Sequence, residues 1–460
     1  MNILQKWENK YLIIPKILQL VVCLQYYTLH NLRHLFATDK FEVSTTQYAE
    51  FISYIQGATF FTNIYWGMMA DRTGKHRKTL IFLNLTTCGI FMLFFADNVF
   101  QMNVWAFWSI LLVYQFFNMP KQPLLDKIIL DYLAQTPNAT PESYGRQRAW
   151  GTIAYTLATF IAESMVKKHV GDKCVYSWGN LLIYCIIFTA ISVTFLSLLV
   201  KTPENVRATN QQSGGYKELL RNPEFSFFIF IMFLNAITRQ AMSNYLGNFF
   251  ARILKIKPYS LPSSWPPSLK SVVQVFNQNY ISTFATFGTF FEILSMYFSE
   301  SIINFLGYFK PLLIAQLISL IRFYAYFVMD KKGKNVFGWC CLIELLKGLY
   351  FGLAHISGFA IASRLAPSYL TVTSQMIFQG VFNVMGSLVS GKLFAYFFEE
   401  SLKKKKDDPV TVEEVQAFES LFAINMLIAL FTISIFIVKY GVMDKILTNN
   451  KKEKEKLTYK

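Results

Sequence analysis

Long apolar stretches separated by short polar connections recur along the whole chain. Each holds about as many residues as a helix needs to cross the hydrocarbon core of a bilayer, about 20. Six stretches precede the polar segment 201–222 and six follow it. They are residues 13–32, 48–69, 80–96, 104–126, 150–165 and 181–199, and then 225–250, 280–305, 311–329, 336–362, 370–398 and 418–442. The pattern predicts an all-α membrane protein with twelve transmembrane helices in two six-helix bundles.

The polar segment KTPENVRATNQQSGGYKELLRN, residues 201–222, divides the two sets of helices. It contains a Gly-Gly pair, a proline and charges of both signs, which is typical of a linker. We therefore predict an N-terminal bundle at 1–200, a cytosolic linker at 201–222, a C-terminal bundle at 223–442 and a basic cytosolic tail at 443–460.

The composition agrees with lipid as the main solvent. Of 460 residues, 53% are hydrophobic and only 16% are charged, whereas soluble domains have about a quarter charged residues. The net charge of +16 would suggest nucleic acid in a soluble chain, but much of it lies in loops and in the tail. Cytosolic flanks beside anionic lipid headgroups explain it better, so we expect a lipid bilayer and no nucleic acid as partner.

Enzymatic chemistry is not indicated by any motif. The six cysteines lack the spacing of a metal site, and the chain has no nucleophile elbow, P-loop or dinucleotide fingerprint. We predict no enzyme activity, no cofactor and no metal.

The distribution of basic residues predicts the orientation. With a cytosolic N-terminus, the cytosolic side receives Lys6, Lys10, the basic cluster at 72–78, the linker and the tail. Because basic residues concentrate in cytosolic loops, both termini are expected in the cytosol. The pattern is compatible with the plasma membrane or an internal membrane.

A short charged motif, GMMADRTGKHRKTL at 67–80, follows the second predicted span. Its spacing resembles the signature that joins helices 2 and 3 in the major facilitator superfamily, with Met69 where leucine is usual. The resemblance implies twelve helices, solute transport, and a role for this loop in bracing the cytosolic gate. The residues that carry it, called the gating motif below, are Gly67, Asp71, Arg72, Gly74, Lys75 and Arg77.

A second motif, YGRQRAWGTIAYTL at 144–157, is similar to the start of helix 5 in lactose permease and the nucleoside-proton symporters. The resemblance implies that Arg148 binds substrate, that Tyr155 stacks on a sugar ring and that Asp126 is the substrate-binding carboxylate. This chemistry suits a polyhydroxylated ligand, because a carboxylate accepts from hydroxyls, a guanidinium donates to oxygens and an aromatic face covers C–H groups. The alternative is a salt bridge between Asp126 and Arg148 that only fixes helix packing.

Charged residues also lie inside the second set of spans. Glu292 and Arg322 fall near the positions of the proton-coupling acid and arginine in the same permease branch. Charges inside a membrane are costly and usually functional, so we expect them to be paired.

The chain departs from that branch in two predicted spans, 336–362 and 225–250. Lys347 stands where the branch usually has a histidine, and Tyr350 where the permease has its proton-binding glutamate. Arg239 lies in a region where the permease carries acids. Glu292 or Glu344 can still take up a proton beside a cation, so we place proton coupling on a network of Glu292, Arg322, Glu344 and Lys347, and count Arg239 with the substrate-binding residues.

Together these observations predict a monomeric secondary transporter that works by alternating access. The favoured activity is proton-coupled symport of a small polar solute, a sugar or a nucleoside. Two alternatives stay open. The surplus of basic residues in the second half suits an organic-anion carrier or exchanger, and the same fold can also serve as a non-transporting receptor or scaffold.

Overall fold

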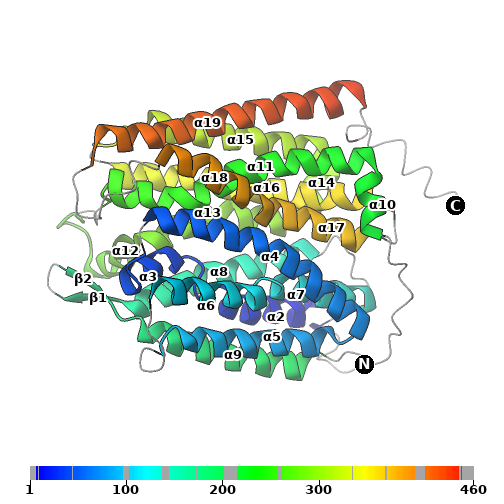
Figure 1. The fold of residues 1–460 in the computed structure, drawn as a ribbon, viewed down its shortest axis with the longest axis horizontal. Helices are drawn as coiled ribbons and strands as arrows, with labels where there is room; N and C mark the ends of the chain where they lie inside the picture. Colours follow the sequence, from blue (N-terminus) through cyan, green and yellow to red (C-terminus); the bar gives the residue numbers. More distant parts are fainter. Residues whose placement is uncertain are drawn as a thin grey trace. The chain divides into compact units, whose positions relative to one another are not determined.

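The computed structural model is almost entirely helical (Figure 1). It describes residues 7–8, 10–43, 45–96, 103–136, 144–170, 173–200, 215–256, 261–333, 335–367, 370–398, 410–444 and 447. The elements before residue 200 are α2 (Ile13–Tyr26), α3 (Arg33–Lys40), α4 (Thr45–Thr73), α5 (His76–Leu93), α6 (Val104–Asn118), α7 (Lys121–Gln135), α8 (Tyr144–Val166), β1 (Lys167–Val170), β2 (Lys173–Tyr176) and α9 (Gly179–Leu199).

The later elements include three π-helical segments, labelled η. They are α10 (Gly215–Arg221), α11 (Pro223–Asn248), η2 (Phe249–Ile253), α12 (Pro267–Gln278), α13 (Tyr280–Tyr297), α14 (Ser299–Leu306), α15 (Phe309–Val328), α16 (Val336–Leu365), α17 (Thr371–Gly380), η4 (Val381–Met385), α18 (Gly386–Phe398), α19 (Val412–Phe436) and η5 (Ile437–Met443).

Two compact units make up the chain. The first comprises the described residues before 210 together with those of Lys255–Thr289, and the second comprises those of Gln211–Leu254, Phe290–Ser401 and Pro409–Lys460. The segment Lys255–Thr289, which contains α12 and the first half of α13, therefore groups with the first unit, whereas the hydrophobic pattern puts it with the second half.

The membrane spans are less uniform than the apolar stretches. Within the described residues, α9, α11, α15, α16 and the continuous helix α19–η5 are long and apolar enough to cross a bilayer. A sixth span is added if α13 and α14, bent by 69° at their junction, count as one broken helix. Other predicted spans are shorter or more polar, and α7 shows why, because Lys121, Asp126, Lys127 and Asp131 fall within its 15 residues.

A short β-hairpin interrupts the helical pattern. β1 and β2 pair in antiparallel register from Lys167 opposite Tyr176 to Val170 opposite Lys173. The hydrophobic pattern gives no signal for it.

In the first unit α2 is the central helix. It packs on α7, α8 and α9, while α5 packs on α6, α7 and α9. One end of this unit is an aromatic core in which the ring of Phe36 meets Phe94 at 5.4 Å and Trp178 at 5.0 Å between centroids. These packed rings hold the α2–α3 segment rigidly against α5, α6 and α9.

In the second unit α15 packs between α16 and α19, and α11 packs on η4, α18 and α19. Two features fix α11. Asn222 accepts a hydrogen bond from the Glu224 amide at 3.0 Å and so caps the helix start, with Pro223 at its first position. A Cβ at Gly386 would collide with the α11 backbone at Ala236, so only glycine permits this close approach of α18.

Candidate functional site

Polar side chains of α2 and α7 meet inside the first unit. Gln19 and Gln122 each donate an amide N–H to Asp126 Oδ1, at 3.2 Å and 2.8 Å. Cys23 donates to Gln122 Oε1 at 3.2 Å. Each pair, Gln19 with Cys23 and Gln122 with Asp126, is spaced by four residues, so each helix presents its polar groups on one face. All four side chains are buried.

Arg148 of α8 joins this cluster. Its side chain crosses Gly151, where a Cβ would lie 2.5 Å from Arg148 Nη1 and 2.9 Å from Gln19 Oε1. Asp126 supplies the strongest charge attraction on this guanidinium. Within the described residues, Arg148 Nε and Nη1 and Asp126 Oδ2 are buried and form no hydrogen bond. The cluster thus retains two donor nitrogens and one acceptor oxygen with which a polar ligand can bond.

Tyr155 lies two turns after Arg148, on the same side of α8. Its hydroxyl donates to Asn31 Oδ1 at 2.8 Å, and Asn31 donates in turn to Thr159 Oγ1 at 2.6 Å. The ring meets Tyr27 edge-on, with 5.0 Å between centroids. The structure therefore places Asp126 and Arg148 in one polar cluster and Tyr155 at its aromatic continuation along α8.

The second unit contains a buried charge cluster between α15 and α16. Arg322 Nη2 lies 2.7 Å from Glu344 Oε1, and Tyr326 donates its hydroxyl to the same oxygen at 2.7 Å. Lys347 Nζ lies 3.6 Å from Glu344 Oε2. The partner of Arg322 in this ion pair is Glu344. One carboxylate here holds two cations and a phenol.

Two further predicted residues lie elsewhere in the second unit. Arg239 of α11 donates to the Phe382 carbonyl at 3.1 Å and lies over the rings of Phe351 and Phe382, at 4.7 Å and 5.1 Å. Glu292 is half-buried on α13, where its backbone packs on α16: a Cβ at Gly352 would lie 3.1 Å from Glu292 Cα.

The gating motif forms the end of α4 and the turn into α5. Gly74 adopts φ 62°, a left-handed conformation that glycine tolerates best. Arg77 donates to the carbonyls of Val200 and Ser197, at 2.8 Å and 2.5 Å, and so satisfies the free end of α9. Lys75 is exposed just before α5. Gly67 lies within α4, and the side chains of Asp71 and Arg72 lie outside the described part of the structure.

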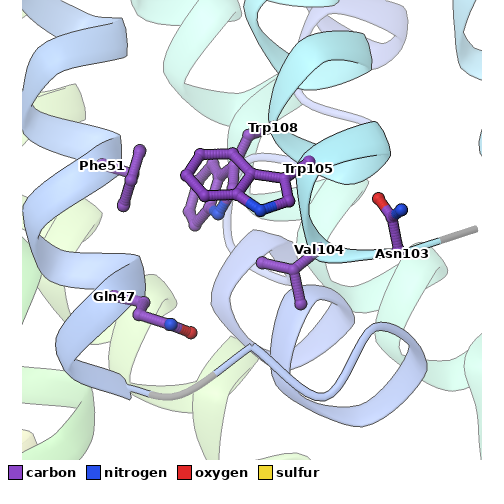
Figure 2. Close-up of a pocket in the computed structure, with 6 residues that line it drawn as sticks. All are labelled: Gln47, Phe51, Asn103, Val104, Trp105 and Trp108. Atoms are coloured by element: carbon purple, nitrogen blue, oxygen red, sulfur yellow. The ribbon is translucent and has the colours of Figure 1, made fainter.

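A surface pocket of different character lies at the start of α4 and α6. Figure 2 shows Phe51 facing Trp105 and Trp108, with Gln47 and Asn103 at its edge. Phe51 stacks on Trp108 at 5.2 Å, and Asn103 caps α6 by accepting from the Ala106 amide at 2.8 Å. Its lining is aromatic and uncharged, as in the aromatic belts at membrane interfaces.

The comparison with protein families identifies the chain. The model of the MFS_1 like family matches residues 43–402. This chain belongs to the MFS_1 like family. The predicted relation to the major facilitator superfamily is thereby confirmed, and the protein is a multi-pass membrane transporter with a small-molecule substrate.

Known proteins similar to this MFS_1 like chain are distant in sequence. The uncharacterized transporter YwbF of Bacillus subtilis (strain 168) is 20% identical over 336 residues, 73% of each chain. The crystal structure of a mutant of the nucleoside transporter NupG superposes with a TM-score of 0.70 at 17% identity, covering 93% of this chain and 98% of that one. An auto-inhibited POT family peptide transporter superposes with a TM-score of 0.65 at 12% identity, covering 93% and 97%. At these identities the likeness shows the fold.

Several polar residues of this MFS_1 like protein were not singled out by the sequence motifs. Gln19, Cys23 and Gln122 surround Asp126, and Lys121 is fully buried with its Nζ 2.6 Å from Gln25 Oε1. The signal that could have found them is the recurrence of polar side chains every fourth residue within apolar spans, which marks a buried polar helix face.

Proposed function

We propose that this protein is a secondary active transporter that carries a small polar organic solute, a sugar or a nucleoside, together with a proton. It would do so by alternating access, with twelve spans in two six-helix bundles at 1–200 and 223–442, joined by the linker 201–222. The observation that carries the proposal is the buried cluster in which Asp126 and Arg148 retain hydrogen-bonding groups.

The chemistry of this cluster favours an uncharged, hydroxyl-rich ligand. Asp126 accepts hydrogen bonds from hydroxyl groups, Arg148 donates to ring or carbonyl oxygens, and the amides of Gln19 and Gln122 do both. The charges of Asp126 and Arg148 offset each other, so an uncharged solute adds no net charge to the buried site. Tyr155 supplies an aromatic face two turns further along α8. NupG, which shares this fold, is named a nucleoside transporter, and that agrees with this class of ligand.

Proton coupling is proposed for the charge cluster of the second unit. Glu344 is buried and shared by Arg322 and Lys347, so a change in its charge alters both ion pairs at once. Glu292 of α13 and Arg239 of α11 belong to the same unit. We assign Glu292 to proton coupling and Arg239 to substrate binding.

The remaining proposals concern topology. The gating motif would lie on the cytosolic side and both termini in the cytosol, with the basic tail 443–460 beside the membrane. The working unit would be a monomer. The turn at Gly74 and the bonds of Arg77 to α9 give this loop a rigid connection through which it can act on helix positions.

An organic-anion carrier is the second candidate. Two cations share one carboxylate at Glu344. An anionic substrate would offset such unbalanced positive charge.

Reconstituted proteoliposomes distinguish these functions. We expect uptake of radiolabelled uridine or glucose to depend on an inward proton gradient, and to fall at least about tenfold in Asp126→Ala and Arg148→Lys, because a lost bond to a charged group costs about 1.5–3 kcal/mol. Asp131→Asn is the matched control, since Asp131 lies on the same helix but is paired with Lys127 at a half-exposed position.

Two other outcomes of the uptake experiment would support the alternative functions. Exchange of organic anions that ignores the proton gradient and is abolished by Lys347→Ala supports the anion carrier. Folded protein that moves none of these solutes, with or without a gradient, supports a receptor or scaffold.

A further inference from the structure

A buried carboxylate outside the proposed substrate cluster lies on the last turns of α8. The side chain of Glu163 is 3% exposed. It accepts a hydrogen bond from the Ser282 backbone amide at 3.0 Å and a second, short one from the Ser282 hydroxyl. Sequence motifs gave no indication of it.

The position of Ser282 explains why a carboxylate is stable here. Ser282 lies in the first turn of α13, where backbone N–H groups have no partner within the helix. The positive end of the helix dipole also attracts a negative charge at this point. Glu163 thus acts as a cap for α13 supplied by another helix, α8.

Among the described residues, Lys167 is the cation that supports the carboxylate. Lys167 Nζ lies 3.7 Å from Glu163 Oε1, longer than a direct hydrogen bond, and donates instead to the Gln278 carbonyl at the end of α12. The same ammonium lies 5.5 Å from the ring centroid of Tyr280. Lys167 is the charged group that acts on Glu163 within the described residues; α13 adds Ser282 and the phenol of Tyr280, and α12 adds a backbone carbonyl.

These contacts belong to a row of residues on one face of α8 and at the start of β1. Residues 156, 160 and 163 of α8 follow one another at helical spacing, Lys167 is the first residue of β1, and all four reach α12 or α13. Thr156 Oγ1 lies 2.9 Å from Thr289 Oγ1, and the ring of Phe160 meets Phe276 at 5.3 Å. These contacts hold α12 and the first half of α13 against α8, and Glu163 is the carboxylate among them.

Protonation of Glu163 would weaken the contact between α8 and the start of α13. Hydrogen bonds to an ionised acceptor are about twice as strong as neutral ones, so a neutral carboxyl holds the Ser282 N–H and O–H less firmly. The attraction of Lys167 and of the α13 helix dipole for the carboxylate would vanish at the same time.

We propose that Glu163 is a proton-binding site and that its protonation releases the first turn of α13 from α8. This proton-binding site is additional to the charge cluster around Glu344. Its link to solute uptake rests on the proposed proton-coupled function, whereas proton binding and release of α13 do not.

Hydrogen exchange of the full-length protein in lipid nanodiscs tests the proposal without any substrate. After correction for intrinsic exchange, amides of residues 278–284 should exchange at least about tenfold faster at pH 5 than at pH 8.5, as expected when a protecting hydrogen-bonded cap is lost. Glu163→Gln, a neutral isostere, should exchange fast at both pH values. Asp131→Asn, which removes a partly exposed carboxylate of the same unit, should behave as the wild type.

Ser282→Ala provides a second test that does not depend on correct folding of Glu163→Gln. It removes the hydroxyl donor and keeps the amide, so protection at pH 8.5 should fall while the pH response stays. Wild-type exchange at 278–284 that is indifferent to pH overturns the proposal, as does Glu163→Gln exchange that keeps the wild-type pH response.

Uptake measurements separate this inference from the proposed function. Release of 278–284 at low pH, in a protein that transports neither uridine nor glucose, rejects the proposed function and leaves the proton site standing. Proton-driven uptake by wild type and Glu163→Gln alike, with no pH response at 278–284, rejects the proton site and leaves the function standing.

Discussion

Replacing Glu344 by alanine should be among the most damaging single changes in the second unit. The carboxylate is 2% exposed and binds the buried Arg322 at 2.7 Å, the Tyr326 hydroxyl at 2.7 Å and, through its other oxygen, Lys347 at 3.6 Å. Removing it leaves the Arg322 guanidinium, which is 5% exposed, without its counter-ion.

The magnitude follows from this burial. Removing one partner of a buried ion pair costs about 3–5 kcal/mol, because an uncompensated charge remains in a medium of low dielectric constant. For a domain of this size each kcal/mol shifts the melting temperature by about 2–4 °C, so a fall of roughly 6–20 °C is expected. Lys347 contributes less, since its side chain is 36% exposed and the attraction is screened by solvent.

Another ion pair of the same unit provides the control. Lys331 and Glu419 approach to 2.6 Å, but their side chains are 19% and 37% exposed. Glu419→Ala should therefore cost at most about 1 kcal/mol, although the distance is shorter. Burial, and not distance, decides the difference.

The assay is thermal unfolding of purified protein in detergent. It is applied to Glu344→Ala and to the double-mutant cycle made of Glu344→Leu, Arg322→Met and the variant that carries both. The double variant should regain part of the stability that each single variant loses, because two apolar side chains leave no buried charge. A cost below about 1 kcal/mol for Glu344→Ala, or strictly additive single and double variants, would refute the reasoning.

Three further predictions concern close packing and capping. Gly151→Ala should displace Arg148 and lower uridine or glucose binding at least about tenfold in a binding assay, with little loss of folded protein. Arg77→Ala removes two bonds to the end of α9 and should lower stability by about 1 kcal/mol, seen as a small fall in melting temperature. Gly386→Ala should cost about 1–3 kcal/mol because it pushes α18 from α11, whereas Gly247→Ala, with open space at its Cβ position, should be neutral.

Part of the architecture could be predicted from the sequence because bilayer helices follow a simple rule of length and hydrophobicity. That rule identified the apolar stretches and, with the gating motif, the superfamily. The rule gives a weaker signal where charged residues interrupt a span, as in α7, whose charges lower its hydrophobicity below that of a lipid-exposed helix. It also gave no signal for the β1–β2 hairpin, whose pairing depends on backbone hydrogen bonds and not on an apolar face.

The candidate sites show the same division. Asp126 and Arg148 were recognisable because Asp126 is a carboxylate at the end of an apolar stretch and Arg148 belongs to a family motif at the start of the next one. The partners Gln19 and Gln122 were not, since an amide is common in sequences and only its position across the helix interface gives it meaning. Glu163 was missed for a related reason: its importance comes from Ser282, more than a hundred residues away in the chain.

The buried carboxylates differ in what their protonation would disrupt, and this difference bears on proton coupling. At Glu344 a proton would break interactions with two cations and a phenol, whereas at Glu163 it would weaken two bonds to Ser282 and one longer attraction to Lys167. Uptake of a proton therefore disturbs less structure at Glu163. We predict that Glu163→Gln lowers gradient-driven accumulation while solute exchange at equal pH persists, and that Glu344→Gln abolishes accumulation and also lowers the melting temperature. Proteoliposome accumulation and exchange assays check this, and normal gradient-driven accumulation by a stably folded Glu344→Gln would remove the second unit from the coupling mechanism.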